Sequence, residues 1–236
     1  YTNLKRFEDA LCAFQRAIAL APDNPNTHNN IGAVLRPMGR LKEAVKHYAI
    51  AADIAPESAQ IWANYANVLM DLDQISKAKI AAQKAAAIDP EYPLAHNNLG
   101  TVLQRQGKYS AAEVSYRSAL ALRSDYADAH ANMGESLKET GRIAESLFHY
   151  ERACELEPKI SAIKSNKLLA LCACDSITPH EISAAHFNWG DQVDLGTDMP
   201  SNPSSRKNQK LRIGYVSPDF RRHSVAYFLE PILTHH

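Results

Sequence analysis

An asparagine recurs at a constant interval of 34 residues along most of this chain. The series runs without a slip through Asn30, Asn64, Asn98, Asn132 and Asn166. Prolines and alanines follow the same period at Pro22, Pro56, Pro90 and Pro158 and at Ala17, Ala51, Ala85, Ala119 and Ala153. A fixed period of this length is typical of stacked units that each bury an apolar face against the next unit. The chain is therefore predicted to be mostly α, built from repeated pairs of helices.

Four complete repeats and one partial repeat account for residues 1–160. The complete repeats are 25–58, 59–92, 93–126 and 127–160, and residues 1–24 are predicted to supply only the second helix of an earlier repeat, with a buried face of Phe7, Ala10, Phe14 and Ala17. The eighth position of each complete repeat holds a small residue that allows close helix packing, at Gly32, Ala66, Gly100 and Gly134. Left-handed residues are expected to end the first helices at Gly39, Asp73, Gly107 and Gly141. This pattern resembles the tetratricopeptide repeat (TPR), whose arrays form a right-handed superhelix.

Two departures from the period predict local changes in structure. Pro37 falls in the last turn of a first helix and should end that helix early. Beyond residue 160 the pattern decays, and residues 161–194 are predicted to form a helical spacer whose first helix covers about 161–173. The run Thr178-Pro179-His180-Glu181 should start a second spacer helix, with threonine as N-cap, proline at N1 and glutamate at N3. That helix is expected to run to about Val193.

The character of the chain changes across residues 195–210, which are polar and rich in proline and serine. This composition predicts a linker. Residues 211–217 form a short β-rich run, and Ser224 could cap a following helix. Strand, loop and helix in this order indicate the opening unit of an α/β domain over residues 211–236. Because so short a segment cannot bury a strand alone, we expect the sequence to be a piece of a longer protein.

The composition argues against several kinds of partner. The 26 basic and 26 acidic residues cancel, so no net field favours nucleic acid or an anionic membrane. No apolar run approaches the roughly 18 residues that span a bilayer. The four cysteines lack a disulfide framework, which favours a reducing compartment such as the cytoplasm. His28, His96 and His130 share one phase of the repeat with Trp62, and we expect them to pack between helices rather than to bind a metal ion, because no second ligand shares their period.

The asparagine series is the candidate binding site. The sixth position of each first helix is expected to face the groove of the superhelix, so that the five amides would line one strip. A side-chain amide carries both a donor and an acceptor and can pair with an extended peptide backbone of any sequence. The alternative is that asparagine is only tolerated on a solvated helix face. Asparagine is a mediocre helix former with no packing reason to recur in phase, however, so the series is predicted to bind extended protein segments.

A histidine in the last segment is the candidate catalytic residue. His223 lies just past the carboxyl end of the predicted strand, where the ligands of open α/β sheets gather. Its imidazole could act as a general base or hydrogen-bond a substrate near the reacting atoms. A structural or solvated loop histidine is the alternative.

Two runs in the same segment carry a more specific resemblance. Together with the repeats and their asparagines, the run Leu211-Arg212-Ile213-Gly214-Tyr215-Val216-Ser217-Pro218-Asp219-Phe220 is similar to the nucleotide-sugar-dependent protein O-glycosyltransferases. That family includes O-GlcNAc transferase and the SPINDLY proteins. The run His223-Ser224-Val225-Ala226-Tyr227-Phe228 resembles its SPINDLY and bacterial-type members.

The resemblance implies a GT-B catalytic region that is truncated here, with residues 211–236 as its first strand, loop and helix and the nucleotide-binding residues beyond His236. It matches His223 to the active-site histidine of the family, as a base or as a positioner of the substrate. The parent protein would transfer GlcNAc or fucose from UDP-GlcNAc or GDP-fucose to serine or threonine of proteins, while this fragment, without a cofactor of its own, would be inactive. Alternatives are a non-catalytic TPR scaffold that binds partner peptides, and a family member that has kept only binding. Oligomers are possible in each case.

Overall fold

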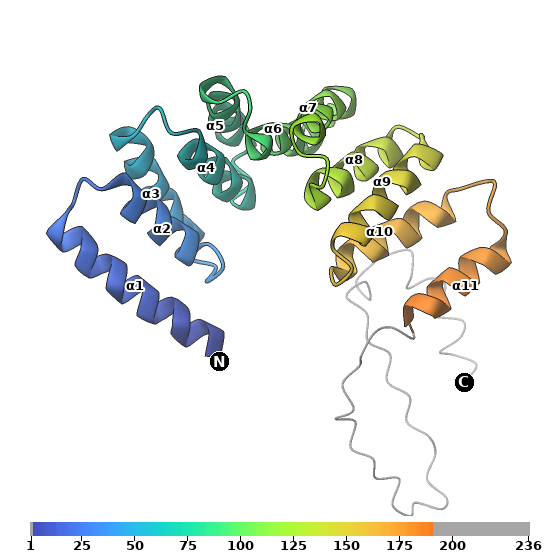
Figure 1. Cartoon of the computed structure of the whole chain (residues 1–236), viewed down its shortest axis with the longest axis horizontal. Coiled ribbons are helices and arrows are strands. Elements are labelled where there is room, and N and C mark those ends of the chain that lie inside the picture. Colours follow the sequence, from blue (N-terminus) through green and yellow to red (C-terminus); the bar gives the residue numbers. More distant parts are fainter. Residues whose placement is uncertain (1, 191–236) are drawn as a thin grey trace, which may run out of the picture. The chain divides into compact units, whose positions relative to one another are not determined.

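A computed structural model describes residues 2–190, with side chains from residue 6 onward, and every regular element in that range is an α-helix (Figure 1). The helices are α1 (Thr2–Leu20), α2 (Pro25–Leu35), α3 (Leu41–Ile54), α4 (Ala59–Asp71), α5 (Ile75–Ile88), α6 (Pro93–Arg105), α7 (Tyr109–Leu122), α8 (Ala127–Glu139), α9 (Ile143–Leu156), α10 (Ser161–Cys172) and α11 (Pro179–Gly190). The predicted linker at 195–210, the predicted GT-B strand, loop and helix at 211–236 and His223 lie outside the described residues.

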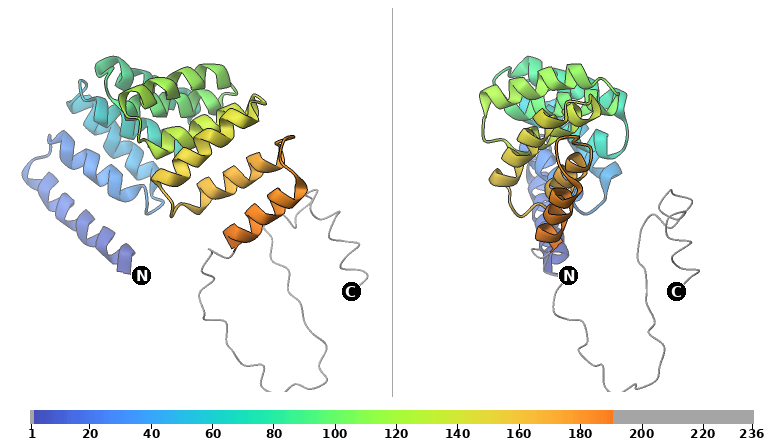
Figure 2. Two further views of the ribbon diagram at one scale, coloured as in Figure 1. Left: turned by 45° about the vertical axis from the view of Figure 1, so that its right-hand side comes forward. Right: turned by 90° about the vertical axis from the view of Figure 1, so that its right-hand side faces the viewer.

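The helices are arranged in successive pairs. Each complete repeat contributes one pair, α2 with α3, α4 with α5, α6 with α7 and α8 with α9. Each second helix also packs against the first helix that follows it, so each pair lies next to the pair before it (Figures 1 and 2). The first helices contact one another from α2 to α10, whereas the second helices α3, α5, α7 and α9 make no such contacts among themselves. The first helices therefore line the inner face of the array, and the second helices form its outer face.

A glycine and a tyrosine bring the two helices close together in three of the four complete repeats. The ring of a buried tyrosine lies against the glycine at the eighth position in the pairs Gly32–Tyr48, Gly100–Tyr116 and Gly134–Tyr150. The approach is closest in the third repeat, where a Cβ atom added to Gly100 would lie 2.4 Å from Cε1 of Tyr116. In the second repeat Ala66 stands in place of the glycine and Ala82 in place of the tyrosine. The small residue predicted at this position is thus matched in size to its partner on the second helix.

The predicted ends of the first helices are confirmed. The backbone angle φ is +74° at Gly39, +71° at Gly107 and +78° at Gly141, and Asp73 adopts a φ of +57° at the equivalent position. The helix α2 has 11 residues, whereas α4, α6 and α8 have 13 each. Pro37 explains the difference, because its ring cannot continue a helix.

The partial repeat contributes α1, which packs against α2. Leu11 of α1 is buried in one cluster with Ile31 and Leu35 of α2. The predicted buried face is only half-buried, at Phe7, Ala10, Phe14 and Ala17. The prediction placed the correct side of α1 against the array and missed Leu11, the most buried of its described side chains.

The spacer contains two helices, and both begin where the sequence predicted. The helix α10 covers Ser161–Cys172, close to the expected 161–173. Before α11 the Thr178 N–H donates to Oε2 of Glu181 at 2.8 Å, and the Glu181 N–H donates to Oγ1 of Thr178 at 3.3 Å. This reciprocal pair of bonds is the predicted capping box. The helix is described as far as Gly190, so its expected end at Val193 lies outside the described residues.

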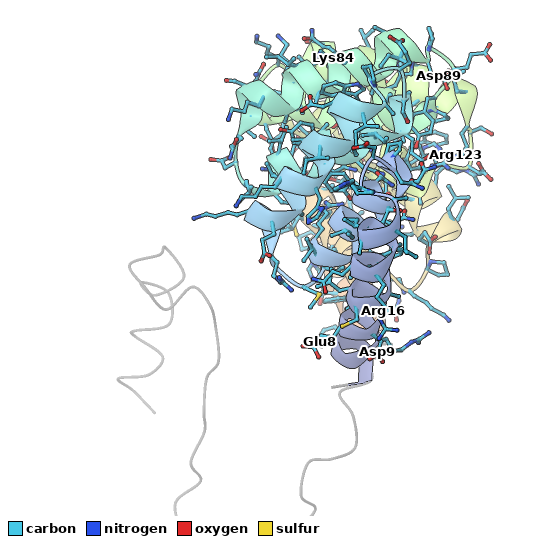
Figure 3. All side chains as sticks on the ribbon, turned by 90° about the vertical axis from the view of Figure 1, so that its left-hand side faces the viewer. Glu8, Asp9, Arg16, Lys84, Asp89 and Arg123 are labelled. Atoms are coloured by element: carbon cyan, nitrogen blue, oxygen red, sulfur yellow. The ribbon has the colours of Figure 1, made fainter. Side chains whose placement is uncertain are left out.

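Charged side chains of both signs cover the outside of the array. Figure 3 labels six exposed examples: Glu8, Asp9, Arg16, Lys84, Asp89 and Arg123. The ammonium group of Lys84 lies 4.1 Å from the ring centre of Trp62, and the Arg123 guanidinium carbon lies 3.6 Å from that of Tyr126. Because three of the six labelled residues are acidic and three are basic, these surface charges favour neither a cationic nor an anionic partner. Among the described residues, none of the helices has the length and apolar character needed to cross a membrane.

Candidate functional site

A polar hollow opens on the inner face between α4, α6 and α8. Its volume is about 320 Å³. The lining residues come from these three helices and from the residue after α2: Arg36, Asn67, Met70, Asp71, Asn97, Asn98, Thr101, Arg105, Asp128, Ala131 and Asn132. Nine of these eleven side chains are polar or charged, so the hollow suits a chain that binds through hydrogen bonds better than an apolar ligand.

The asparagines of the 34-residue series link the first helices of neighbouring repeats. Asn98 Nδ2 donates to the carbonyl oxygen of Ala63 at 2.9 Å. Asn98 and Ala63 lie 35 residues apart in the sequence, and two further bonds span the same distance along the chain. Asn64 Nδ2 donates to Asn29 Oδ1 at 2.9 Å, and Asn132 Nδ2 donates to Asn97 Oδ1 at 3.1 Å. The expectation that asparagine has no packing reason to recur is therefore wrong, because these bonds join neighbouring repeats. Three of the five members of the series, Asn64, Asn98 and Asn132, therefore stabilise the stack.

The structure brings two members of the series together in the hollow. Asn98, which is 2% exposed, and the half-buried Asn132 both line it, together with Asn97. Asn64 is half-buried one repeat earlier, Asn30 is exposed, and Asn166 is half-buried on α10, and none of these three is among the residues that line the hollow. The bond to Ala63 uses one N–H of Asn98, and a primary amide has a second N–H and an acceptor oxygen. The inner face thus combines stacking bonds with polar groups at the edge of an open space.

Charged residues at one end of the hollow were missed by the sequence analysis. The guanidinium of Arg36 donates to both carboxylate oxygens of Asp71, at 2.5 Å and 3.2 Å. Arg105 Nη1 donates to the carbonyl oxygen of Met70 at 2.8 Å. Both contacts span 35 residues, the same offset as the asparagine bonds. Arg36 and Asp71 neutralise each other, and Arg105 Nη1 lies 3.9 Å from a carboxylate oxygen of Asp73.

An ionised carboxylate lies on the same inner face in the fourth repeat. Glu135 Oε2 accepts a hydrogen bond from the hydroxyl of Tyr150 at 2.6 Å, and Glu135 Oε1 accepts one from Lys138 Nζ at 2.8 Å. Burial by itself would raise the pKa of Glu135, but the bonds from Lys138 and Tyr150 lower it overall. The negative charge of Glu135 is therefore compensated by Lys138 and Tyr150, which belong to the same repeat.

The ring nitrogens at the fourth position of each repeat bond to the backbone, as predicted for residues packed between helices. His28, His96 and His130 each place Nε2 near the carbonyl oxygen six residues earlier, at 2.9, 2.8 and 3.1 Å. Trp62 donates from Nε1 to the equivalent carbonyl of Pro56 at 2.8 Å. These bonds tie the start of each first helix to the turn that precedes it.

Replacing Asn98 by alanine is expected to lower the free energy of unfolding by about 1–2 kcal/mol, because a buried hydrogen bond between two repeats is lost. Replacing the exposed Asn30 is expected to change the same quantity by less than about 0.5 kcal/mol. Urea unfolding of both variants followed by circular dichroism measures the difference. Equal effects at the two positions would show that the bond to Ala63 contributes nothing.

Family models of the tetratricopeptide repeat match several segments of the chain. One described as "TPR repeat" matches residues 1–39 and 105–141. Three described as "Tetratricopeptide repeat" match residues 59–92, 81–114 and 127–160. The first and the last of these three segments coincide with complete repeats defined by the asparagine period.

The chain is similar over part of its length to plant proteins. It is 38% identical over 90 residues to the "Probable UDP-N-acetylglucosamine--peptide N-acetylglucosaminyltransferase SPINDLY" of Oryza sativa subsp. japonica, across 37% of this chain and 10% of that protein. The protein of the same name from Arabidopsis thaliana is 34% identical over 87 residues, across 35% of this chain and 9% of its own length. The matches thus span about a tenth of these relatives, within their TPR part.

Solved structures share the fold at low sequence identity. PilW, a "widely conserved type IV pilus biogenesis factor", has a TM-score of 0.69 and 18% identity over 86% of this chain and 90% of that chain. TTC0263, a thermophilic TPR protein of Thermus thermophilus, has a TM-score of 0.63 and 23% identity over 72% of this chain and 92% of its own. YrrB, "a TPR protein with an unusual peptide-binding site", has a TM-score of 0.53 and 20% identity over 79% and 94% of the two chains. The period, the helix pairs and these matches agree: the chain contains an array of tetratricopeptide repeats, similar in sequence to the repeat region of SPINDLY-type proteins.

Proposed function

We propose that the repeats bind extended segments of acceptor proteins and present them to the catalytic region of a protein O-glycosyltransferase. The observation that carries the proposal is the polar hollow on the inner face, where Asn98 and Asn132 meet across two repeats. Side-chain amides pair with the N–H and C=O groups of a main chain whatever its sequence. Many different acceptors could therefore use the same surface.

The charges around the hollow support an uncharged or polar ligand. Arg36 is neutralised by Asp71, and Arg105 is bonded to a backbone carbonyl. Arg105 also lies 3.9 Å from a carboxylate oxygen of Asp73. An acidic peptide would have to compete with Asp71 for Arg36 and would face the exposed carboxylate of Asp128, whereas a segment rich in serine and threonine carries no charge of its own. One structural relative, YrrB, is described as having a peptide-binding site, which is compatible with this use of the fold.

The catalytic part of the proposal rests on the resemblance of residues 211–228, which lie outside the described residues, and on the names of the plant relatives. In this proposal the full-length protein acts in the cytoplasm and transfers GlcNAc or fucose from UDP-GlcNAc or GDP-fucose to serine or threonine. His223 acts next to the acceptor hydroxyl, as base or positioner. The donor binds beyond His236.

A non-catalytic TPR scaffold is the second candidate. It is favoured by the fact that the matches to the plant relatives fall within their TPR part. Such a scaffold would bind the same extended segments in the same hollow, and residues 211–236 would be dispensable for it. The two candidates thus share the binding surface and differ in what happens to the bound segment.

An assay of the full-length protein separates the two candidates. The protein is incubated with a mixed protein extract and with radiolabelled UDP-GlcNAc or GDP-fucose in separate reactions. The proposed enzyme transfers label to proteins from one donor, and the His223→Ala variant does not. Binding of extract proteins without transfer from either donor would favour the scaffold.

Replacing both Asn98 and Asn132 by alanine in the full-length protein is expected to weaken glycosylation of protein acceptors several-fold and to leave hydrolysis of the donor unchanged. The reason is that the amides contact the acceptor and not the nucleotide sugar. Because Asn98 also stabilises the stack, both activities are measured at a temperature where circular dichroism shows the variant to be folded. Equal loss of both activities would argue against a recruiting role.

A further inference from the structure

Two histidine pairs join the helices of the first and the fourth complete repeat. His28 of α2 faces His47 of α3 with 3.1 Å between their Nδ1 atoms, and His130 of α8 faces His149 of α9 with 2.9 Å between theirs. His47 and His149 lie three periods of the repeat apart, as His28 and His130 do. The expectation that no second ligand shares the period of the first-helix histidines is therefore wrong for these two repeats.

The backbone fixes the orientation of the first-helix member of each pair. Nε2 of His28 lies 2.9 Å from the carbonyl oxygen of Pro22, and Nε2 of His130 lies 3.1 Å from that of Ser124. A carbonyl oxygen can only accept, so Nε2 carries the hydrogen and Nδ1 of the neutral ring presents its lone pair to the facing histidine. Histidines that bind metal ions commonly donate their other ring N–H to a carbonyl in this way.

We propose that each pair binds one divalent transition-metal ion through its two Nδ1 atoms. In the metal-free chain a hydrogen bond joins the two Nδ1 atoms, and the rings lie nearly end to end with their centres 5.3 and 5.1 Å apart, so a metal ion replaces that bond and both rings turn towards it. For metal–nitrogen distances of about 2.0–2.1 Å, the separations of the Nδ1 atoms correspond to an angle of about 90–100° at the metal. This angle fits neighbouring positions of the square-planar or octahedral geometry of Cu²⁺ and Ni²⁺. Within residues 2–190 no three His, Cys, Asp or Glu side chains are grouped so that they could hold a metal, so water completes the coordination and the affinity is modest.

The protons and charges of the pair are compatible with metal binding. In the metal-free pair the second-helix ring donates its Nδ1 hydrogen; on binding, that hydrogen leaves and Nε2 of the same half-buried ring takes one up, so no net proton is released. Glu43 and Glu145 stand four residues before the second-helix histidines His47 and His149 and are paired with Arg40 and Arg142, so the charged side chains beside each pair of histidines balance.

The two central repeats provide a control within the same chain. His96 makes the same bond to a backbone carbonyl, but Ser115 occupies the position that His47 and His149 have in the other repeats. In the second repeat these two positions hold Trp62 and Ala81. The proposal therefore predicts two sites in the chain, and no site at His96.

The test is a titration of the full chain, without a histidine tag, with NiCl₂ in an isothermal calorimeter. The chain is expected to bind two more equivalents of Ni²⁺ than the double variant His47→Gln/His149→Gln, and each single variant is expected to lose one equivalent. The variant His96→Gln is expected to bind as the parent chain does. Equal stoichiometry in the parent chain and a folded double variant would overturn the proposal.

A second measurement needs no substitution. Long-range ¹H–¹⁵N correlation spectra of the unaltered chain are recorded during titration with Zn²⁺, which is diamagnetic. The Nδ1 resonances of His28, His47, His130 and His149 are expected to shift, while both ring nitrogens of His96 keep their positions. Shifts confined to other histidines would contradict the proposed sites.

Discussion

Replacing Gly100 by alanine is expected to lower the free energy of unfolding by about 3 kcal/mol, the largest effect of any single methyl group in the array. The added Cβ atom would lie 2.4 Å from Cε1 of Tyr116, and the ring of Tyr116 is fully buried and cannot move aside. The overlap outweighs the gain of about 1 kcal/mol that alanine brings to a helix interior relative to glycine. Urea unfolding of the two proteins measures the difference.

Two controls isolate the contact with the ring. At Gly134 the equivalent Cβ would lie 3.1 Å from the ring of Tyr150, so the same substitution there is expected to change stability by less than about 1 kcal/mol. In a background with Tyr116→Ala, which copies the Ala66–Ala82 pair of the second repeat, Gly100→Ala is expected to be neutral or stabilising. A large loss of stability in that background would mean that something other than the ring excludes a side chain at position 100.

Filling the hollow is expected to reduce binding of acceptor proteins by at least tenfold. Asn67 lines the hollow from α4 and takes no part in the bonds between Asn64, Asn98 or Asn132 and the preceding repeats. Asn67→Trp therefore places a bulky ring in the path of an extended segment without removing a stacking bond. Acceptor affinity, measured by fluorescence anisotropy with a labelled acceptor peptide, is expected to fall while the melting temperature stays within a few degrees of the parent protein.

The matched control adds the same bulk to the opposite side. Val114 lies on α7, on the outer face, and is 64% exposed. Val114→Trp is expected to leave acceptor affinity unchanged. If both tryptophan variants bind acceptor as the parent protein does, the hollow is not the binding surface.

The features that follow from neighbouring residues in one helix or turn could be predicted from the sequence. Pro37 shortened α2, and Thr178 and Glu181 formed their capping box, because each feature depends on residues a few positions apart. The repeats themselves were located by the 34-residue period. The small residue at the eighth position was also expected. Its dependence on a tyrosine was not, because that partner lies on the other helix of the pair.

The bonds between repeats could not be predicted in the same way. The sequence analysis placed the asparagines on the groove side but not opposite the residue 35 positions earlier, because that register depends on how one repeat is rotated against the next. The Arg36–Asp71 pair occurs in one copy and so gave no periodic signal. The histidine pairs join a first helix to a second helix, and that contact depends on how the two helices of one repeat pack together.

Site-specific photocrosslinking tests the central claim most directly. A benzophenone side chain is placed in the full-length protein at position 128, where Asp128 is exposed and lines the hollow, or at position 114 on the outer face. After irradiation with an acceptor protein, we expect crosslinks from position 128 and none above background from position 114, with crosslinked residues in an extended segment of the acceptor. Crosslinks from position 114 alone, or equally from both positions, would contradict binding on the inner face of the repeats.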